Sequence, residues 1–197
     1  SKGISLFISP KKIISEDGSL SERNDVKVVS IEHKLGTIAS PTCVLAFGDI
    51  EGASAEILAQ ENGGLKAMFT MMNNARLNVG IQGVSIAERA YQQALKFSLT
   101  RMQGNSIDGA SEGTVAIIDH PDVQRMLMDM KSRTEAMRAL SLYTANELDL
   151  SKGASSEEER HKAQENLDIL TPIVKAWCTD QGVLISSTGI QIHGGMG

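Results

Sequence analysis

The end of the sequence holds a cluster of glycines that is expected to expose free backbone amides to a ligand. The last helical stretch closes as QIHGGMG, which contains Gln191, Gly194 and Gly195. A helix needs only one glycine to end, and glycine lets a ligand approach backbone N–H groups closely. The surplus of glycines therefore predicts a ligand site at this end of the chain.

Two arginines have positions that suit an anionic partner. Arg76 lies in the first third of a helical stretch beside Asn73 and Asn74, where an arginine among apolar residues needs an anion or a hydrogen-bond partner. A surface salt bridge is the alternative. Arg101 ends the same stretch before a glycine-containing loop, and its charge suits either the helix dipole or a phosphate group. Both arginines therefore keep a structural and a binding interpretation.

The sequence lacks the patterns of several common catalytic sites. Neither a G-x-S-x-G nucleophile elbow nor a Walker phosphate loop occurs in it. The histidines share no spacing typical of metal ligands, and we interpret each as exposed or as satisfied by an ordinary hydrogen bond. They are His33, His120, His161 and His193. We therefore predict no metal site and identify no catalytic residue within the chain.

The composition indicates an acidic globular protein. The 197 residues carry a net charge of −5 and are 41% hydrophobic, which allows a substantial core but no broad basic surface for nucleic acid. No stretch approaches the roughly 20 apolar residues that span a membrane. Cys43 and Cys178 lie far apart and suit neither a zinc site nor a disulfide framework. This favours a reduced, cytoplasmic setting.

The first fifty residues are predicted to form strands. Short β-branched or aromatic runs occupy 3–9, 25–36 and 41–49, and turn sequences at 16–25 and 36–41 separate them. Three strands alone make a marginal sheet in water. We therefore expect partner strands upstream.

Long helices are predicted for the rest of the chain. Apolar residues keep helical spacing over 63–102, although Gly80 and Gly83 interrupt it, which predicts one very long helix or two in line. The Gly/Ser-rich segment 103–116 is predicted to be a loop. A second amphipathic helix is expected from His120 to Leu150.

A third helix completes the predicted bundle. The polar linker 151–160 ends in acidic residues that suit a helix N-terminus, and Pro172 should either kink the helix or mark an internal start. Long helices joined by polar loops form an antiparallel bundle, and methionines on their apolar faces suit its core. The predicted fold class is α+β, mainly an antiparallel bundle of long helices preceded by a partial β-sheet domain.

Four segments in this order resemble one protein family. The acyl-CoA dehydrogenase family is similar to this chain over about residues 3–197, in the segments IEHKLGTIASPTCVLAFGD, ENGGLKAMFTMMNNARLNVGIQGVSIAERAYQQALKFSLTRMQG, HPDVQRMLMDM and STGIQIHGGMG. The sequence segments SIEHKLG, SPTC and MFTMMNNAR are most similar to the branch that includes methylthiopropanoyl-CoA dehydrogenase. The resemblance implies that residues 1–51 are the end of the family's middle β-domain. Residues 52–197 would be most of its C-terminal helical domain.

The resemblance also implies a chemistry and a set of site residues. A member of this family uses FAD to remove an α-proton and a β-hydride from an acyl-CoA, leaving a trans-2-enoyl-CoA. Two residues match the substrate site, Arg76 and Asn73, although many relatives carry an aspartate in place of Asn73. Five residues match those that contact the FAD of a neighbouring subunit, chiefly its diphosphate: Arg101, Gln103, Gln191, Gly194 and Gly195.

The resemblance implies partners and an incomplete active site. It implies a homodimer or homotetramer, with electron-transfer flavoprotein as the electron acceptor. In most of the family the general base is a glutamate, which we expect just beyond Gly197, so the 197-residue chain alone is expected to be inactive. Two alternatives stay open: a non-catalytic helical assembly or binding module on the same scaffold, and an acyl-CoA oxidase.

Overall fold

The computed structural model describes residues 3–109 and 112–197, and the chain folds as two compact units. The first unit comprises Ser1–Met71 and the second Met72–Gly197. The division falls inside the first long helix, α1 (Gly64–Thr100). The domain boundary expected between residues 51 and 52 stays a prediction.

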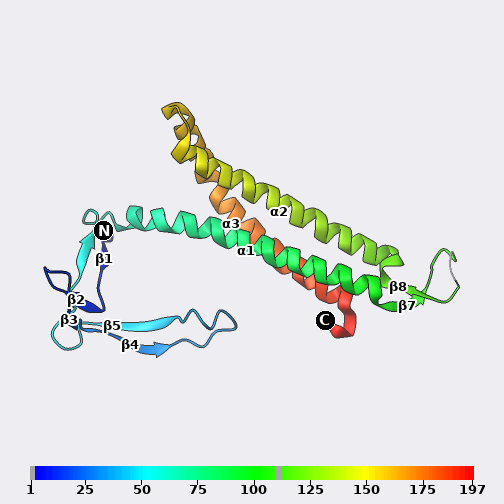
Figure 1. The fold of residues 1–197 in the computed structure, drawn as a ribbon, viewed down its shortest axis with the longest axis horizontal. Coiled ribbons are helices and arrows are strands. Elements are labelled where there is room, and N and C mark those ends of the chain that lie inside the picture. The colour runs from blue at the N-terminus through cyan, green and yellow to red at the C-terminus, as the bar shows by residue number, and fades with distance from the viewer. Residues whose placement is uncertain (1–2, 110–111) are drawn as a thin grey trace. The chain divides into compact units, whose positions relative to one another are not determined.

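Six short strands of the first unit form three antiparallel pairs (Figure 1). The pairs are β1 (Leu6–Ile8) with β6 (Glu56–Leu58), β2 (Lys12–Ile14) with β3 (Leu20–Arg23), and β4 (Val26–Ile31) with β5 (Cys43–Phe47). The three predicted runs contain β1, β4 and β5, which confirms those strands. The other three strands are only three or four residues long, too short to show an alternating pattern.

The turn predicted over 16–25 is wrong in its second half, because β3 lies there. The observed turn is short, since Gly18 has a φ of 80° and its N–H donates to the Ser15 carbonyl at 2.9 Å. Glycine reaches this left-handed conformation at no steric cost. The chain therefore reverses within a few residues, and the segment from Leu20 onward pairs with β2.

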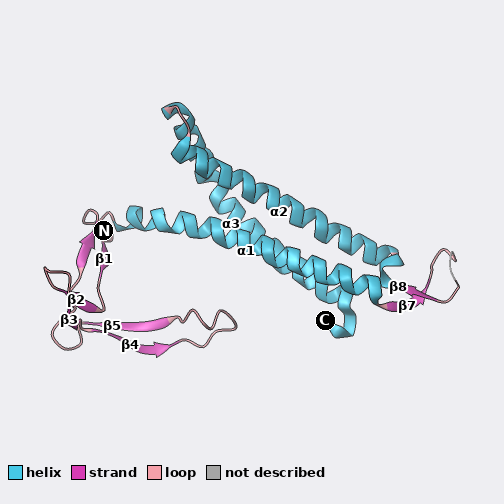
Figure 2. Ribbon diagram, in the orientation of Figure 1, coloured by secondary structure: helices cyan, strands magenta, loops and turns pink. Residues whose placement is uncertain are grey.

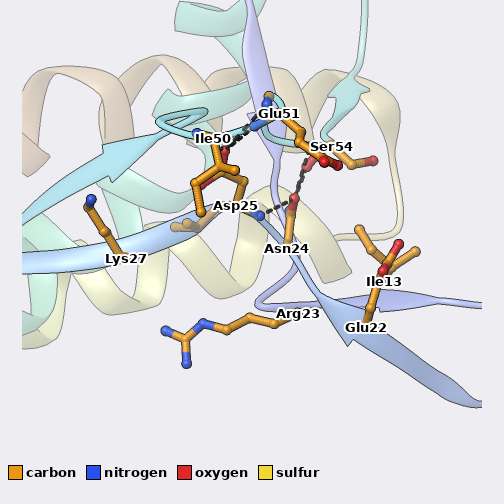
Figure 3. A pocket seen from close by; sticks show the side chains of 11 residues that line it. Ile13, Glu22, Arg23, Asn24, Asp25, Lys27, Ile50, Glu51 and Ser54 are labelled. Atoms are coloured by element: carbon orange, nitrogen blue, oxygen red, sulfur yellow. Dashed lines mark hydrogen bonds between the residues drawn. The ribbon is translucent and has the colours of Figure 1, made fainter.

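One asparagine and one aspartate fasten a loop in the first unit (Figure 3). Asp25 Oδ2 accepts hydrogen bonds from the backbone N–H groups of residues 50–52 at 2.6, 3.0 and 3.3 Å. These bonds hold the pKa of the Asp25 carboxyl below its ordinary value, and the bond from the N–H of residue 50 has the largest effect. Buried Asn24 bonds the backbone of Ser54 in both directions, at 2.8 and 2.9 Å. Asn24 and Asp25 therefore act as a structural clamp on residues 50–54.

Three long helices make up most of the second unit (Figure 2). After α1 come α2 (Pro121–Gly153) and α3 (Glu157–His193). α1 is continuous, so the alternative of two helices in line is wrong. The predicted antiparallel bundle is confirmed: α1 and α3 end where α2 begins (Figure 1).

The loop predicted over 103–116 contains a hairpin, which is a correction. Strand β7 (Met102–Asn105) pairs antiparallel with β8 (Thr114–Ala116), and the short 3₁₀ turn η1 (Ile117–Asp119) follows. Residues 110 and 111 of that loop lie outside the described residues. Composition indicated a loop because glycine and serine are rare in strands, whereas the backbone hydrogen bond from Ile117 N–H to the Arg101 carbonyl fixes this hairpin to the end of α1.

The third helix begins with a cap and continues across its proline. Ser156 accepts a hydrogen bond from the Glu159 N–H at 3.2 Å, and three glutamates occupy the first turn, as the acidic linker predicted. Because α2 extends to Gly153, the linker is shorter than expected. Pro172 lies inside α3, so an internal helix start there is wrong.

Glycines let α1 and α3 pack with their backbones in close contact. A Cβ atom built on Gly83 would lie 2.4 Å from the Cys178 carbonyl oxygen, and one built on Gly80 would lie 2.6 Å from a methyl group of Val174. Gly182 faces Gly83 from the other helix, at 3.2 Å from its carbonyl oxygen. The glycines that weakened the helix prediction are therefore required by helix packing.

Two methionines lie at the centre of the bundle, as predicted, whereas Met71, Met102, Met128 and Met196 are exposed. Met130 and Met137 of α2 are fully buried, beside Val174, Cys178 and Ile185 of α3. The thioether side chain adapts to irregular gaps between helices. Within the described ranges, no helix combines the length and apolar character needed to cross a membrane.

Candidate functional site

A hollow of about 830 Å³ lies at one end of the second unit, where α1 and α3 end and α2 begins. We call it the terminal hollow. Its walls include Phe97, Arg101, Gln103, His120, Gln191, His193, Gly194 and Gly195. All five residues expected to bind FAD are in this set, although some 90 positions of the sequence separate the first from the last. The antiparallel course of the helices brings them together.

Arg101 presents its charge at the terminal hollow from a fixed backbone. Its N–H donates to the Phe97 carbonyl at 2.9 Å, and its own carbonyl accepts from Ile117 N–H at 2.8 Å. The side chain is exposed, and within residues 3–109 and 112–197 it has neither an ion-pair nor a hydrogen-bond partner. The guanidinium is therefore available to an anionic ligand.

Gln103 is positioned by a histidine at the start of α2. His120 Nε2 lies 2.7 Å from the Gln103 carbonyl oxygen; because a carbonyl only accepts, Nε2 must carry the proton. Next to it, Gly104 has a φ of 72°, and a Cβ there would lie 3.4 Å from the His120 ring. The strand is thus held against α2, with the Gln103 side chain exposed beside the hollow.

The glycines after α3 differ in part from the expectation of free backbone amides. Gly194 caps the helix with a φ of 60°, and its N–H donates to the carbonyls of Gln191 and Ile190. That N–H is therefore not free for a ligand, which corrects the prediction at this residue. A Cβ built on Gly194 or Gly195 would meet nothing within 4 Å, so the backbone at both residues faces open space. Close approach of a ligand is sterically possible there.

The terminal hollow favours an anion. None of its lining residues, as far as the structure describes them, is an aspartate or glutamate, in a chain that has 24 of these residues. Arg101 supplies a positive charge, and the amides of Gln103 and Gln191 supply neutral donors. This donor set, together with the open glycines, fits the diphosphate of a dinucleotide such as FAD.

Two histidines of the hollow were missed as site residues. The interpretation of each as satisfied by an ordinary hydrogen bond is confirmed, since His120 bonds the Gln103 carbonyl and His193 Nδ1 lies 2.7 Å from the Gly189 carbonyl. Their position at the hollow was not predicted. The available signal was adjacency: His193 stands between Gln191 and Gly194 in the sequence.

The two residues expected at the substrate site lie apart from this group. Arg76 Nη1 donates to Asn73 Oδ1 at 3.4 Å, one helical turn away on α1. Neither residue lines the terminal hollow. Their role toward substrate, like that of the five other residues toward FAD, stays a prediction. In the described part of the chain, no three His, Cys, Asp or Glu side chains are grouped as metal ligands would be.

A solved acyl-CoA dehydrogenase has the same fold. The structure of Caenorhabditis elegans ACDH-11 in complex with C11-CoA matches with a TM-score of 0.71 at 25% sequence identity, over 93% of this chain and 32% of that one. The family model described as acyl-CoA dehydrogenase, C-terminal domain, matches residues 62–197. The chain therefore belongs to the acyl-CoA dehydrogenase family.

Two curated relatives extend this similarity along the whole chain. The 3-methylmercaptopropionyl-CoA dehydrogenase of Ruegeria pomeroyi is 47% identical over 196 residues, which are 100% of this chain and 33% of that protein. A butyryl-CoA dehydrogenase of Syntrophomonas wolfei is 39% identical over 200 residues, covering 99% of this chain and 33% of that protein. Because methylmercaptopropionyl and methylthiopropanoyl denote the same group, the first agrees with the expected branch. The chain spans about a third of the length of these relatives.

Proposed function

We propose that this chain is part of an FAD-dependent acyl-CoA dehydrogenase that converts an acyl-CoA thioester to a trans-2-enoyl-CoA. Family membership supports this reaction, as do relatives whose names specify dehydrogenation of acyl-CoA thioesters. Their acyl groups differ, so the proposed substrate class is the acyl-CoA thioester without a defined acyl chain. We assign no general base within the chain.

The observation that carries the proposal is the convergence of the five expected FAD-binding residues on one hollow, whose described lining residues include no carboxylate. Arg101 would pair with the diphosphate, and the side-chain amides of Gln103 and Gln191 would donate to its oxygens. Gly194 and Gly195 would leave room for it. When bound, FAD supplies the hydride acceptor, while these residues bind and orient it.

Substrate and partner roles complete the proposal. The pair formed by Arg76 and Asn73 on α1 would contact the acyl-CoA, as the family resemblance implies. The same resemblance supports a homodimer or homotetramer and electron-transfer flavoprotein as the electron acceptor. Because the chain spans about a third of its relatives, we expect the 197-residue polypeptide alone to show no acyl-CoA-dependent dye reduction.

Replacement of Arg101 tests the FAD site directly. Arg101→Gln removes the charge-assisted hydrogen bonds, which contribute about 1.5–3 kcal/mol each, so FAD affinity should fall by roughly 10- to 100-fold. Flavin fluorescence titration of the purified protein measures this. Lys96→Gln is the matched control, because Lys96 is an exposed cation on α1 that does not line the hollow. Equal FAD affinity in the Arg101 variant and the unaltered protein would refute the site.

A further inference from the structure

The imidazole of His193 is held in one orientation beside the terminal hollow. Its Nδ1 lies 2.7 Å from the Gly189 carbonyl, one helical turn earlier in α3. Its ring stacks on Phe97 of α1, with centroids 4.5 Å apart and an interplanar angle of 27°. The carbonyl can only accept, so Nδ1 carries a proton. Nε2 is therefore the ring nitrogen that remains for another partner.

The described residues that line the hollows beside this ring include cations and no carboxylates. His193 lines both the terminal hollow and a second hollow of about 390 Å³ between α1 and α3. Besides His193, three charged or titratable side chains line these two hollows. They are Arg89 on α1, Arg101 directly after the end of α1, and His120 at the start of α2. No acidic residue is among the described residues that line either hollow. A charged imidazole here would therefore be favoured by a bound anion and opposed by the arginines.

Nε2 of His193 can donate a hydrogen bond to phosphate only when it is protonated. With Nδ1 protonated, a neutral ring offers Nε2 only as an acceptor, which a phosphate oxygen cannot satisfy. Protonation turns Nε2 into a charged donor, and charge-assisted N–H to phosphate bonds are about twice as strong as neutral ones. Histidine is the side chain that changes charge between pH 5 and 8.

We propose that His193 is a second phosphate-binding residue of the terminal hollow, and that it binds the FAD diphosphate in its protonated form together with Arg101. This inference rests on the proposed function, because it assumes a diphosphate ligand at this hollow. Binding would then take up a proton at His193. Because binding takes up a proton, FAD affinity should rise as pH falls, by at most about tenfold per pH unit.

The pH dependence of FAD affinity separates this role from a structural one. We would titrate the apoprotein with FAD between pH 6 and pH 8 and compare the unaltered protein with His193→Phe. Phenylalanine keeps an aromatic ring against Phe97 but has no Nε2. We expect the unaltered protein to bind FAD about tenfold more tightly at pH 6 than at pH 8, and the variant to lose that difference. An unchanged pH profile in a folded His193→Phe protein would overturn the inference.

Further variants distinguish failure of the inference from failure of the FAD site. His193→Gln covers the case in which the phenylalanine variant does not fold, and a thermal unfolding transition checks folding of each. His120→Gln tests the other histidine: loss of the pH difference there, with the difference retained in the His193 variants, contradicts the proposal. If Arg101→Gln weakens FAD binding at both pH values while His193→Phe keeps the original profile, the FAD site stands and only the role of His193 is refuted.

Discussion

At the residue scale, Arg101 decides the sign of the field at the terminal hollow. The carboxyl ends of α1 and α3 and the amino end of α2 meet there, and each helix end carries roughly half a charge, negative for the first two and positive for the third. Without side chains, the helix ends alone would disfavour an anion. The full positive charge of Arg101, unopposed by any carboxylate among the described lining residues, reverses that balance.

Cys178 is a second residue whose environment has a measurable consequence. Its side chain is fully buried, and this burial raises the pKa of its thiol above the ordinary value, opposed only by a contact with Ser141 Oγ at 3.8 Å. The unfolded thiol, with a pKa of about 8.5, would lose its proton first. The folded state therefore binds more protons at alkaline pH, and the free energy of unfolding should fall as pH rises above about 8.5.

We predict that Cys178→Ala removes this alkaline loss of stability. Urea unfolding between pH 8 and pH 10 should show a contribution of at most about 1.4 kcal/mol per pH unit in the unaltered protein, and the variant should lack it. Cys43→Ala is the matched control, because it makes the same chemical change at a half-buried cysteine of the first unit. An identical slope in the Cys178 variant would contradict the prediction.

At the element scale, apolar spacing predicted the long helices, and β-branched runs predicted β1, β4 and β5, whereas β2, β3, β6 and the hairpin β7–β8 were missed. The three helices each run for more than 30 residues, so many turns repeat the apolar spacing. The hairpin β7–β8 has only seven strand residues, MQGN and TVA, too few to repeat an apolar pattern, and hydrogen bonds with Arg101 and with His120 at the start of α2 hold it in place. Arg101 and the QIHGG segment were identified separately. Only the antiparallel helix order makes them neighbours, and His120 was missed for that reason.

The crossing of α1 and α3 gives a prediction at this scale. Gly83→Ala would place a methyl group 2.4 Å from the Cys178 carbonyl oxygen, so the two helix backbones must separate. Overpacking of this kind costs about 1–3 kcal/mol, which chemical denaturation can measure as a lower free energy of unfolding.

Gly153→Ala provides the control for that substitution. Gly153 is the last residue of α2, and a Cβ there would meet nothing within 4 Å. The same chemical change should therefore be neutral, or stabilising by up to about 1 kcal/mol. If both alanine variants were equally stable, the close approach of α1 and α3 would not be a packing requirement.

At the scale of the whole molecule, the terminal hollow lies at the open end of the bundle, where its lining residues Gln103, Gly194 and Gly195 are exposed. The exposure of the proposed diphosphate site suits a ligand that is also held by a second chain. The family resemblance implies such an arrangement, with FAD contacted across a subunit interface. FAD binding and self-association would then be thermodynamically linked.

This linkage predicts that FAD promotes oligomer formation. Sedimentation velocity of the purified protein at low micromolar concentration should shift toward dimer or tetramer when FAD is added at about 100 times its Kd. At that concentration a bound ligand stabilises the associated state by about 2.7 kcal/mol per site. Arg101→Gln should abolish the shift, because it removes the proposed contact with the neighbouring subunit's FAD, whereas Lys96→Gln should retain it. FAD that binds with no change in the sedimentation profile would show that each hollow acts within a single chain.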